Sequence, residues 1–366
     1  MNRRKNPVLS TFLLGGFLLG FMAGLTWAQP QGPVEKVKVA LVLPGPVGDA
    51  GWNYAHMRGL KALEKALPYV ETHYTEMVSE GAEAERVFTA YARRGYHVIL
   101  AGSFGYMDSA LAVAKKFPQV VMLHCCGFKT APNMGTYYVR DYEVGYLAGI
   151  LAGQMTKSNI IGFVGSHPIP NIVMNVNAFG LGVRSVNPKA KIHLVWIQSW
   201  YDPAKEREAA ESVMDVGADV VGQYVDSPAV QQAAEKRGRY SIGMYSDMSA
   251  FAPKSHLTSQ VWNWGSFFID AVKQVHEGAW KSQRLLWGLK EGAVELTAFN
   301  PAVPPSVRQQ IEEQKAAIRE GRLNIFTGPI RDQKGEVRVP AGKPLSYSEA
   351  WNLGFLVEGF VGTLPK

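Results

Sequence analysis

Aromatic and carboxylate side chains gather in the short segments that follow the predicted strands of this chain. The first such segment, Gly48 to Asn53, combines glycines, which allow close approach to the backbone, with Trp52, whose ring offers a stacking face. The side chains that we select as candidate ligand contacts are Trp52, Asn53, Phe104, Trp200, Tyr224, Asp226, Tyr245, Asp247 and Trp262. Aromatic faces with a few amides and carboxylates suit a flat, polar-edged, uncharged heterocycle, and they also suit a sugar. No Arg or Lys converges on these segments, so a phosphate or a dicarboxylate fits poorly.

The elements that must position these side chains are short apolar runs alternating with helical patterns. In the first series we expect Val37–Leu43, Asn53–Leu67, Val70–Tyr74, Glu83–Arg94, Val98–Ala101, Met107–Phe117 and Val120–His124. In the second we expect Glu143–Met155, Ile160–Val164, Asn175–Asn187, Lys191–Trp196, Pro203–Val216, Asp219–Gly222, Ala229–Arg237 and Ser241–Met244, with a further apolar run at Leu257–Val261. Such alternation predicts βαβ units with parallel sheets. Two series of about equal size predict two α/β lobes.

The predicted topology also places the candidate ligand contacts. In a doubly wound sheet a ligand binds beyond the carboxyl ends of the strands, where the strand order reverses. That edge of each lobe becomes one wall of a cleft, and the aromatic segments all lie on this side. The tail departs from the alternation, with a polar helix at Pro304–Gly321, a hairpin at Asn324–Val339 that turns at Gly335, and an amphipathic helix at Ser348–Val361.

The N-terminus has the pattern of an export signal. Arg3, Arg4 and Lys5 precede an apolar run from Val8 to Leu25, and Ala28 offers a small residue for cleavage. We therefore expect residues 1–28 to be a cleaved signal peptide and the rest to be periplasmic; an uncleaved N-terminal anchor is the alternative. No Cys stands at the cleavage point, so we expect no lipid anchor.

Composition and motifs narrow the function classes. The 366 residues are 47% apolar and 19% charged, which is typical of a globular chain. The net charge is +7, and the sequence contains no block of five like charges, so we expect no nucleic-acid partner. The sequence contains no G-x-S-x-G, no H-E-x-x-H and no G-x-G-x-x-G motif, and its eight His residues show no metal spacing. We expect no catalytic residues, no metal and no cofactor. Cys125 and Cys126 are either two buried thiols or a vicinal disulfide.

Several of these segments resemble a known family. Asp49-Ala50-Gly51-Trp52-Asn53 is similar to the D-x-G-F-N signature of basic membrane protein (BMP)-type solute-binding proteins, which are purine-nucleoside receptors of ABC importers. The same order of motifs continues through Gly102-Ser103-Phe104-Gly105, Ser199 to Lys205 and Gly359 to Gly362. The resemblance covers roughly Lys36 to Pro365. It implies a type I periplasmic-binding fold, with two lobes joined by three crossovers that close on the ligand by a hinge, and no enzymatic activity.

The resemblance also implies lobe boundaries and partners. Lobe 1 is expected to contain residues 36–140 and about 256–280, and lobe 2 residues 141–255 and about 285–345. Residues 346–366 are expected to form a C-terminal helix near the hinge. The implied partners are a small-molecule ligand and an ABC permease in the inner membrane, and we expect a monomer.

Two departures from the family pattern concern the ligand. Tyr245 stands where nucleoside-binding members have an Asp that holds the ribose, and Trp262 replaces a Lys. We therefore expect a free purine base such as adenine, with Trp52 and Trp200 stacked on its two faces. Asn53 and either Asp226 or Asp247 would then bind the ring edge, and Phe104, Tyr224, Tyr245 and Trp262 would close the pocket. A purine nucleoside, another small solute, or a ligand sensor for a membrane receptor are the alternatives.

Overall fold

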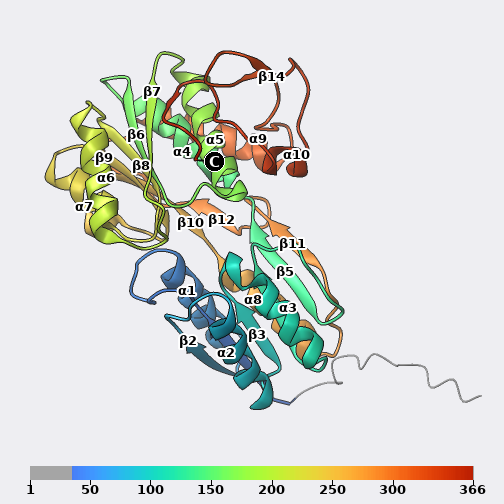
Figure 1. Ribbon diagram of the computed structural model, residues 1–366. Helices are drawn as coiled ribbons and strands as arrows, with labels where there is room; N and C mark the ends of the chain where they lie inside the picture. The colour runs from blue at the N-terminus through green and yellow to red at the C-terminus, as the bar shows by residue number, and fades with distance from the viewer. Residues whose placement is uncertain (1–34, 366) are drawn as a thin grey trace, which may run out of the picture.

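The computed structural model describes residues 35–365 and shows two α/β lobes (Figure 1). The expected signal peptide, residues 1–28, lies outside the described residues. Within the described range, no helix has the length and apolar character needed to cross a membrane.

The first lobe is built on a six-stranded parallel sheet with the order β11-β5-β4-β3-β1-β2. Its strands are β1 (Val37–Val42), β2 (Val70–Thr75), β3 (Val98–Ala101), β4 (Val121–Cys125), β5 (Met134–Val139) and β11 (Arg284–Trp287). Its helices are α1 (Trp52–Ala66), α2 (Ala82–Arg93), α3 (Met107–Lys116) and α8 (Trp264–His276). Strand β1 alternates between the two faces: Val39 and Leu41 share a core with α1 and α8, whereas Ala40 packs in the core that contains α2 and α3.

The second lobe repeats this arrangement with seven strands in the order β12-β10-β9-β8-β6-β7-β15. Its strands are β6 (Ile160–Gly165), β7 (Lys191–Trp196), β8 (Val220–Tyr224), β9 (Tyr240–Tyr245), β10 (His256–Trp262), β12 (Val294–Leu296) and β15 (Phe360–Val361). Its helices are α4 (Tyr142–Met155), α5 (Pro170–Val186), α6 (Pro203–Asp215), α7 (Ala229–Lys236) and α9 (Pro305–Arg319). Only β12 runs antiparallel to its neighbour among the described strands of this sheet.

The chain crosses between the lobes three times, from β5 to α4, from β10 to α8 and from β11 to β12. Two expected boundaries are wrong. Residues 256–262 form β10, which pairs with β9 in lobe 2, and residues 284–287 form β11, which pairs with β5 in lobe 1. Strand pairing determines the lobe to which each segment belongs, because each strand extends a sheet whose edge would otherwise be unpaired.

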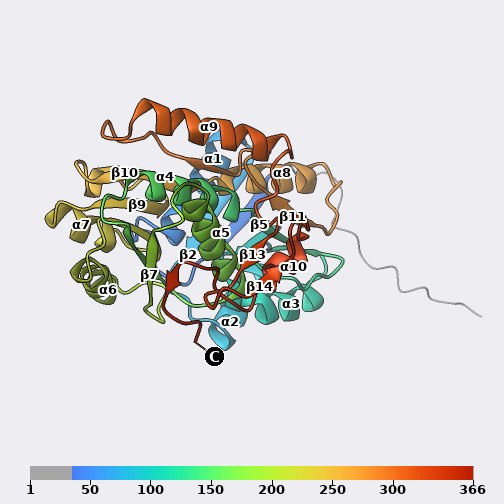
Figure 2. The same cartoon turned by 90° about the horizontal axis from the view of Figure 1, so that it is seen from above.

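The tail also differs from the sequence prediction in one element. The expected helix at Ser348–Val361 is limited to α10 (Tyr347–Trp351), and the chain then continues as an irregular loop to β15 beside β7. The side-chain amide of Asn177 on α5 explains this, because it donates to the carbonyl of Phe355 (2.8 Å) and accepts from the amide of Val357 (2.9 Å). Figure 2 shows this last segment, in red, passing over α5.

Other parts of the tail and of the helical series agree more closely. The helix at Pro304–Gly321 is confirmed as α9, and the hairpin forms with β13 (Ile330–Arg331) and β14 (Val337–Val339), with Gly335 at a φ of 82°. Helix α5 begins at Pro170, five residues before the expected start, because proline is suited to the first helical turn. Strands β5, β11 and β12 are absent from the predicted series.

Helices α4 and α5 pack closely because glycines face the contact. Gly145, Gly149 and Gly153 recur every fourth residue of α4, so they share one face. A Cβ atom at Gly149 would lie only 2.0 Å from the carbonyl oxygen of Phe179 on α5. The backbones of the two helices therefore meet without intervening side chains.

We expect Gly149→Ala to lower the free energy of unfolding by about 1–3 kcal/mol, because the two helices must move apart. The measurement is urea unfolding followed by circular dichroism. Gly354→Ala is the matched control, since a Cβ atom there meets no atom within 4 Å. Alanine favours a helix over glycine, so a variant at Gly149 as stable as the wild type would contradict the close packing.

Candidate ligand-binding site

The strand orders of the two sheets reverse at positions that face each other across the lobes. In lobe 1 the reversal lies between β1 and β3, and in lobe 2 it lies between β6 and β8. Trp52 follows β1 and Phe104 follows β3, whereas Asn171 follows β6 and Asp226 follows β8. All four side chains line one pocket, as expected for a ligand site at such reversals.

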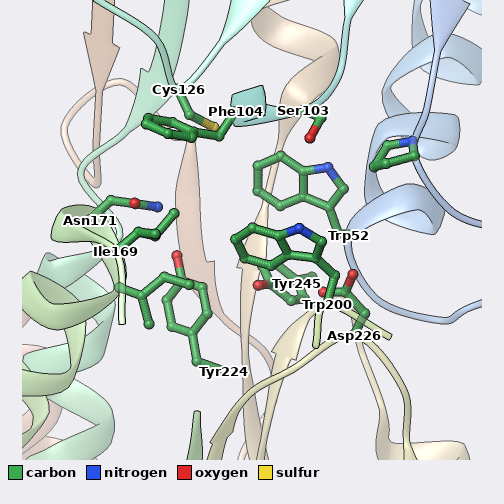
Figure 3. Close-up of a pocket in the computed structure, with 12 residues that line it drawn as sticks. Trp52, Ser103, Phe104, Cys126, Ile169, Asn171, Trp200, Tyr224, Asp226 and Tyr245 are labelled. Carbon is green, nitrogen blue, oxygen red and sulfur yellow. The ribbon is translucent and has the colours of Figure 1, made fainter. Parts of the chain in front are cut away.

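This pocket contains about 430 Å³ of space free of protein atoms, part of it open to solvent. It is lined by Pro44, Trp52, Ser103, Phe104, Cys126, Ile169, Asn171, Ile172, Trp200, Tyr224, Asp226 and Tyr245. Figure 3 shows Trp52, Trp200, Tyr245 and Asp226 on one side and Asn171 and Ile169 opposite them. None of the lining residues carries a basic side chain.

The loop before α1 is fixed by the buried carboxylate of Asp49. Its oxygens accept hydrogen bonds from the backbone amides of Gly51, Asn53 and Tyr54, at 2.8–2.9 Å. The Asn53 side chain also donates to Asp49 (2.6 Å) and accepts from Gly45 N. These bonds satisfy the free amides at the start of α1. They hold the backbone of the segment that carries Trp52.

The indole ring of Trp52 is held in place by a hydrogen bond and by neighbouring aromatic rings. Its Nε1 donates to the carbonyl of Gly102 (2.7 Å). Its edges contact other aromatic rings, among them Tyr245 and Trp262, with ring centroids 5.7 and 5.4 Å away. Trp262 in turn packs against Tyr245 at 4.7 Å. This cluster fixes the indole without covering its pocket side.

The two lobes touch beside the pocket. A Cβ atom at Gly51 of lobe 1 would lie 2.0 Å from the backbone oxygen of Asp226 in lobe 2. The hydroxyl of Ser246 in lobe 2 donates to the carbonyl of Ala50. The structure is therefore the closed form of the cleft, and Gly51 is the residue that allows this approach.

Asp226 is a buried acid at the pocket with no basic partner among the described residues. Burial raises the pKa of its carboxyl group well above the usual value, and the nearby carboxylates of Asp49 and Glu206 raise it further, whereas the Tyr245 hydroxyl lowers it. Such a group needs a donor to be charged at neutral pH. No group of three or more His, Cys, Asp or Glu in the described part of the chain is arranged to hold a metal ion.

A chain of buried hydrogen bonds runs from the pocket to the first crossover. The amide of Asn171 donates to the hydroxyl of Tyr138 (2.9 Å), which lies 3.1 Å from the hydroxyl of Tyr224. Tyr224 donates to the carboxyl group of Asp141 (2.7 Å). Burial raises the pKa of Asp141 to about 7, and the bond from Tyr224 opposes this rise. The side-chain oxygen of Asn171 has no donor among the described residues.

Comparisons with known proteins agree with this geometry. The family model for PnrA-like ABC transporter substrate-binding proteins, named Bmp, matches residues 36–325. A purine-binding protein of Brucella abortus is 43% identical over 354 residues, which cover 96% of this chain and 99% of that protein. The chain belongs to the Bmp family.

Further matches to this Bmp protein are more distant, one in sequence and one in structure. A Haloferax volcanii protein that bears the name of an ABC transporter glucose-binding protein is 37% identical over 294 residues, 80% of this chain and 75% of its own. A solute-binding protein of Aeropyrum pernix has a TM-score of 0.70 at 19% identity, covering 88% of this chain and all of that one. This Bmp protein is the substrate-binding component of an ABC transporter and not an enzyme.

The structure of this Bmp protein brings six of the nine predicted ligand contacts into the pocket. These are Trp52, Phe104, Trp200, Tyr224, Asp226 and Tyr245. Asn53 and Trp262 are buried behind the wall. Asp247 is exposed and accepts a hydrogen bond from the amide of Ser249 in its own loop, so the carboxyl group at the pocket is that of Asp226. The expected stacking between Trp52 and Trp200 stays a prediction.

Sequence reasoning missed six residues of the lining. They are Pro44, Ser103, Cys126, Ile169, Asn171 and Ile172. Ile169 and Asn171 escaped because helix α5 was expected to begin at Asn175. Proline is common in the first turn of a helix, so Pro170 could have indicated the true start of α5. The loop between β6 and this start would then have been placed at the cleft.

Replacing Gly51 with Ala should block closure of the lobes, because the new methyl group meets the backbone of Asp226. Measured by calorimetry with the purine base that is proposed below as the ligand, the affinity should fall at least tenfold, or about 1.4 kcal/mol. Gly48→Ala is the control from the same loop, because its Cβ meets no atom within 4 Å. Equal affinity of the two variants would contradict the role of Gly51, provided that circular dichroism shows both folded.

Asp141 should make folding stability depend on pH. Its pKa is about 7 in the folded protein against 3.8 in the unfolded reference, so the folded state binds more protons between these values. Its contribution to stability is present below about pH 4 and is lost as the pH rises through about 7. Between pH 5 and 8 the free energy of unfolding should fall by roughly 1 kcal/mol or more relative to Asp141→Asn. Urea unfolding of both proteins measures this, and parallel pH profiles would contradict it.

Proposed function

We propose that this protein captures a free purine base, adenine or a close analogue, and delivers it to the permease of an ABC importer. The observation that carries the proposal is an aromatic pocket between the lobes that contains a buried acid, Asp226, without a basic partner in the described part of the chain. A purine base offers flat faces to the aromatic side chains and N–H donors to the acid. The purine-binding relative from Brucella abortus supports this ligand class.

The polar groups at the pocket match the edge of a base. The carboxyl group of Asp226 accepts a hydrogen bond from a ring N–H or an exocyclic amino group. The unpartnered oxygen of Asn171 accepts a second one, because it is buried at the pocket wall and has no donor of its own. A phosphate is disfavoured, since Asp49 and Glu206 add negative charge beside Asp226.

Tyr245 and Trp262 support a base in place of a nucleoside. Both side chains are buried, and their rings meet at 4.7 Å beside Trp52. They occupy volume that a ribose would need, and Trp262 presents no polar atom to the pocket. Ribose hydroxyls buried without partners would cost about 1–3 kcal/mol each.

The cellular setting is part of the proposal. A cleaved signal peptide over residues 1–28 would place a monomeric protein in the periplasm, where it would meet the permease in the inner membrane. The membership in a family of extracytoplasmic substrate-binding proteins supports this location. Ligand binding would close the hinge and release would follow docking on the permease.

Calorimetric titration with adenine, adenosine and glucose tests the ligand. We expect adenine to bind and adenosine to bind about a hundredfold more weakly, since its ribose has no place in the closed pocket. The protein is first unfolded, dialysed and refolded, so that a copurified ligand does not mask binding. Equal affinity for adenosine would overturn the exclusion of ribose, and tight binding of glucose alone would overturn the purine assignment.

Two matched substitutions test the contacts in the same titrations. Trp200→Ala should weaken adenine binding at least about tenfold, whereas Tyr201→Ala, in the same loop but outside the lining, should not.

Proton release on binding tests Asp226. Because a ligand N–H lowers the pKa of Asp226, binding at mildly acidic pH should release protons. Titrations in two buffers of different ionisation enthalpy detect this release. Asp226→Asn should abolish this release. A variant that releases as many protons as the wild type would contradict the role of Asp226.

A further inference from the structure

Two adjacent thiols meet at the wall of the pocket. Cys125 is the last residue of β4 and Cys126 follows it, and their sulfur atoms lie 2.8 Å apart. Successive side chains of a strand usually point to opposite faces. Here Cys126 has a φ of 67°, in the left-handed region that non-glycine residues rarely adopt, which turns its side chain toward that of Cys125. A backbone hydrogen bond from Cys126 N to the carbonyl of Tyr137 (3.0 Å) fixes the turn.

Only one of the two thiols belongs to the ligand site. Cys126 lines the pocket between the lobes, at the end formed by Ser103 and Phe104 (Figure 3). It also lines a second cavity on its other side, which Tyr138 and Trp351 help to form. Cys125 is fully buried in the core of lobe 1 and lines neither space. A change at this pair therefore reaches the ligand through Cys126.

We propose that Cys125 and Cys126 form a reversible vicinal disulfide, and that this bond reshapes the ligand pocket at Cys126. The oxidant is a disulfide, carried by a thiol–disulfide oxidoreductase or by a small molecule such as oxidised glutathione. The Cys126 thiolate attacks the oxidant and releases one thiol. The Cys125 sulfur then attacks the mixed disulfide and releases the second. Two cysteine thiols lose two protons and two electrons in total, and one disulfide of the oxidant becomes two thiols.

Two physical arguments support this proposal. The two sulfur atoms are already closer together than non-bonded sulfur atoms normally are. The distance between bonded sulfur atoms in a disulfide is about 2.05 Å. Members of this family act outside the cytoplasm, and extracytoplasmic compartments favour disulfides. The closed form opposes the reaction, because burial raises the pKa of both thiols and the Cys125 thiol raises that of Cys126 further, so the reactive thiolate is scarce there. Opening of the cleft would give the oxidant access, because Cys126 lies where the lobes part.

Ring closure must change the pocket. An eight-membered ring across one peptide bond requires both side chains and the local backbone to rotate, and the Cys126 sulfur moves toward Cys125. The bonded form also has no S–H donor at the wall. Since the thiol form lines the closed pocket, we expect the oxidised protein to bind its ligand at least about tenfold more weakly. This second half of the inference rests on the proposed function, whereas formation of the bond does not.

Intact mass spectrometry tests the bond without any ligand. The purified protein is exposed to oxidised glutathione or to a phosphine reductant, then unfolded and alkylated with iodoacetamide. The reduced protein should gain two carbamidomethyl groups and the oxidised protein none. Two groups on the oxidised sample, or glutathione still attached to one cysteine, would overturn the vicinal disulfide.

Calorimetry with adenine on the same two samples tests the effect on the pocket. Cys125→Ala is the matched control, because it cannot form the ring yet keeps the Cys126 thiol at the wall. Its affinity should equal that of the reduced wild type and should not respond to oxidised glutathione once the mixed disulfide is excluded by mass. Equal affinity of oxidised and reduced wild type would overturn the effect on the pocket. If neither form binds any purine base, the proposed function fails, and the mass result still decides the bond.

Discussion

The closed cleft depends on a buried chain of hydrogen bonds that joins ligand site, lobes and hinge. Asn171 and Tyr224 belong to lobe 2, Tyr138 to lobe 1, and Asp141 to the crossover between them. Each buried hydroxyl in this chain would cost about 1–3 kcal/mol if it lost its partner. Relative motion of the lobes must therefore break or replace bonds at the back of the pocket. The chain consequently couples the position of the lobes to the groups that a ligand contacts.

The same chain explains how an acidic residue is tolerated at the hinge. Asp141 is fully buried and forms no ion pair with the described residues, and its raised pKa keeps it partly protonated at neutral pH. A protonated carboxyl group can accept from Tyr224 and still donate a hydrogen bond, whereas an isolated buried charge would be expensive. Asp226 follows the same rule at the pocket, where the Tyr245 hydroxyl is the one donor among the described residues that lowers its pKa. Neither acid forms an ion pair with the described residues, and of the two acids it is Asp226 that lines the space for a ligand.

Sequence reasoning found the parts of this site that depend on local pattern. Alternating apolar runs predicted both sheets, and the strand-end rule placed Trp52, Phe104 and Asp226 at the cleft from the sequence alone. It failed where tertiary contacts decide the outcome. The Asn177 amide binds the tail as a loop where amphipathic spacing predicted a helix, and β11 joins lobe 1 only by pairing with β5. Asp247 resembles Asp226 in sequence position, and only the loop after β9 shows that it turns to solvent.

The aromatic residues near Trp52 have two different functions, lining the pocket and supporting the lining, and the sequence alone does not distinguish them. Trp262 has no access to the pocket, yet its ring supports Tyr245 and Trp52, which do. A support of this kind is rigid because edge-to-face contacts fix the ring orientations, so the wall is formed before a ligand arrives. A preformed wall avoids the entropy cost of ordering side chains on binding. It also resists expansion, and a larger ligand would have to displace several packed rings at once. Selectivity by size in this pocket therefore comes as much from the residues behind the wall as from those that touch the ligand.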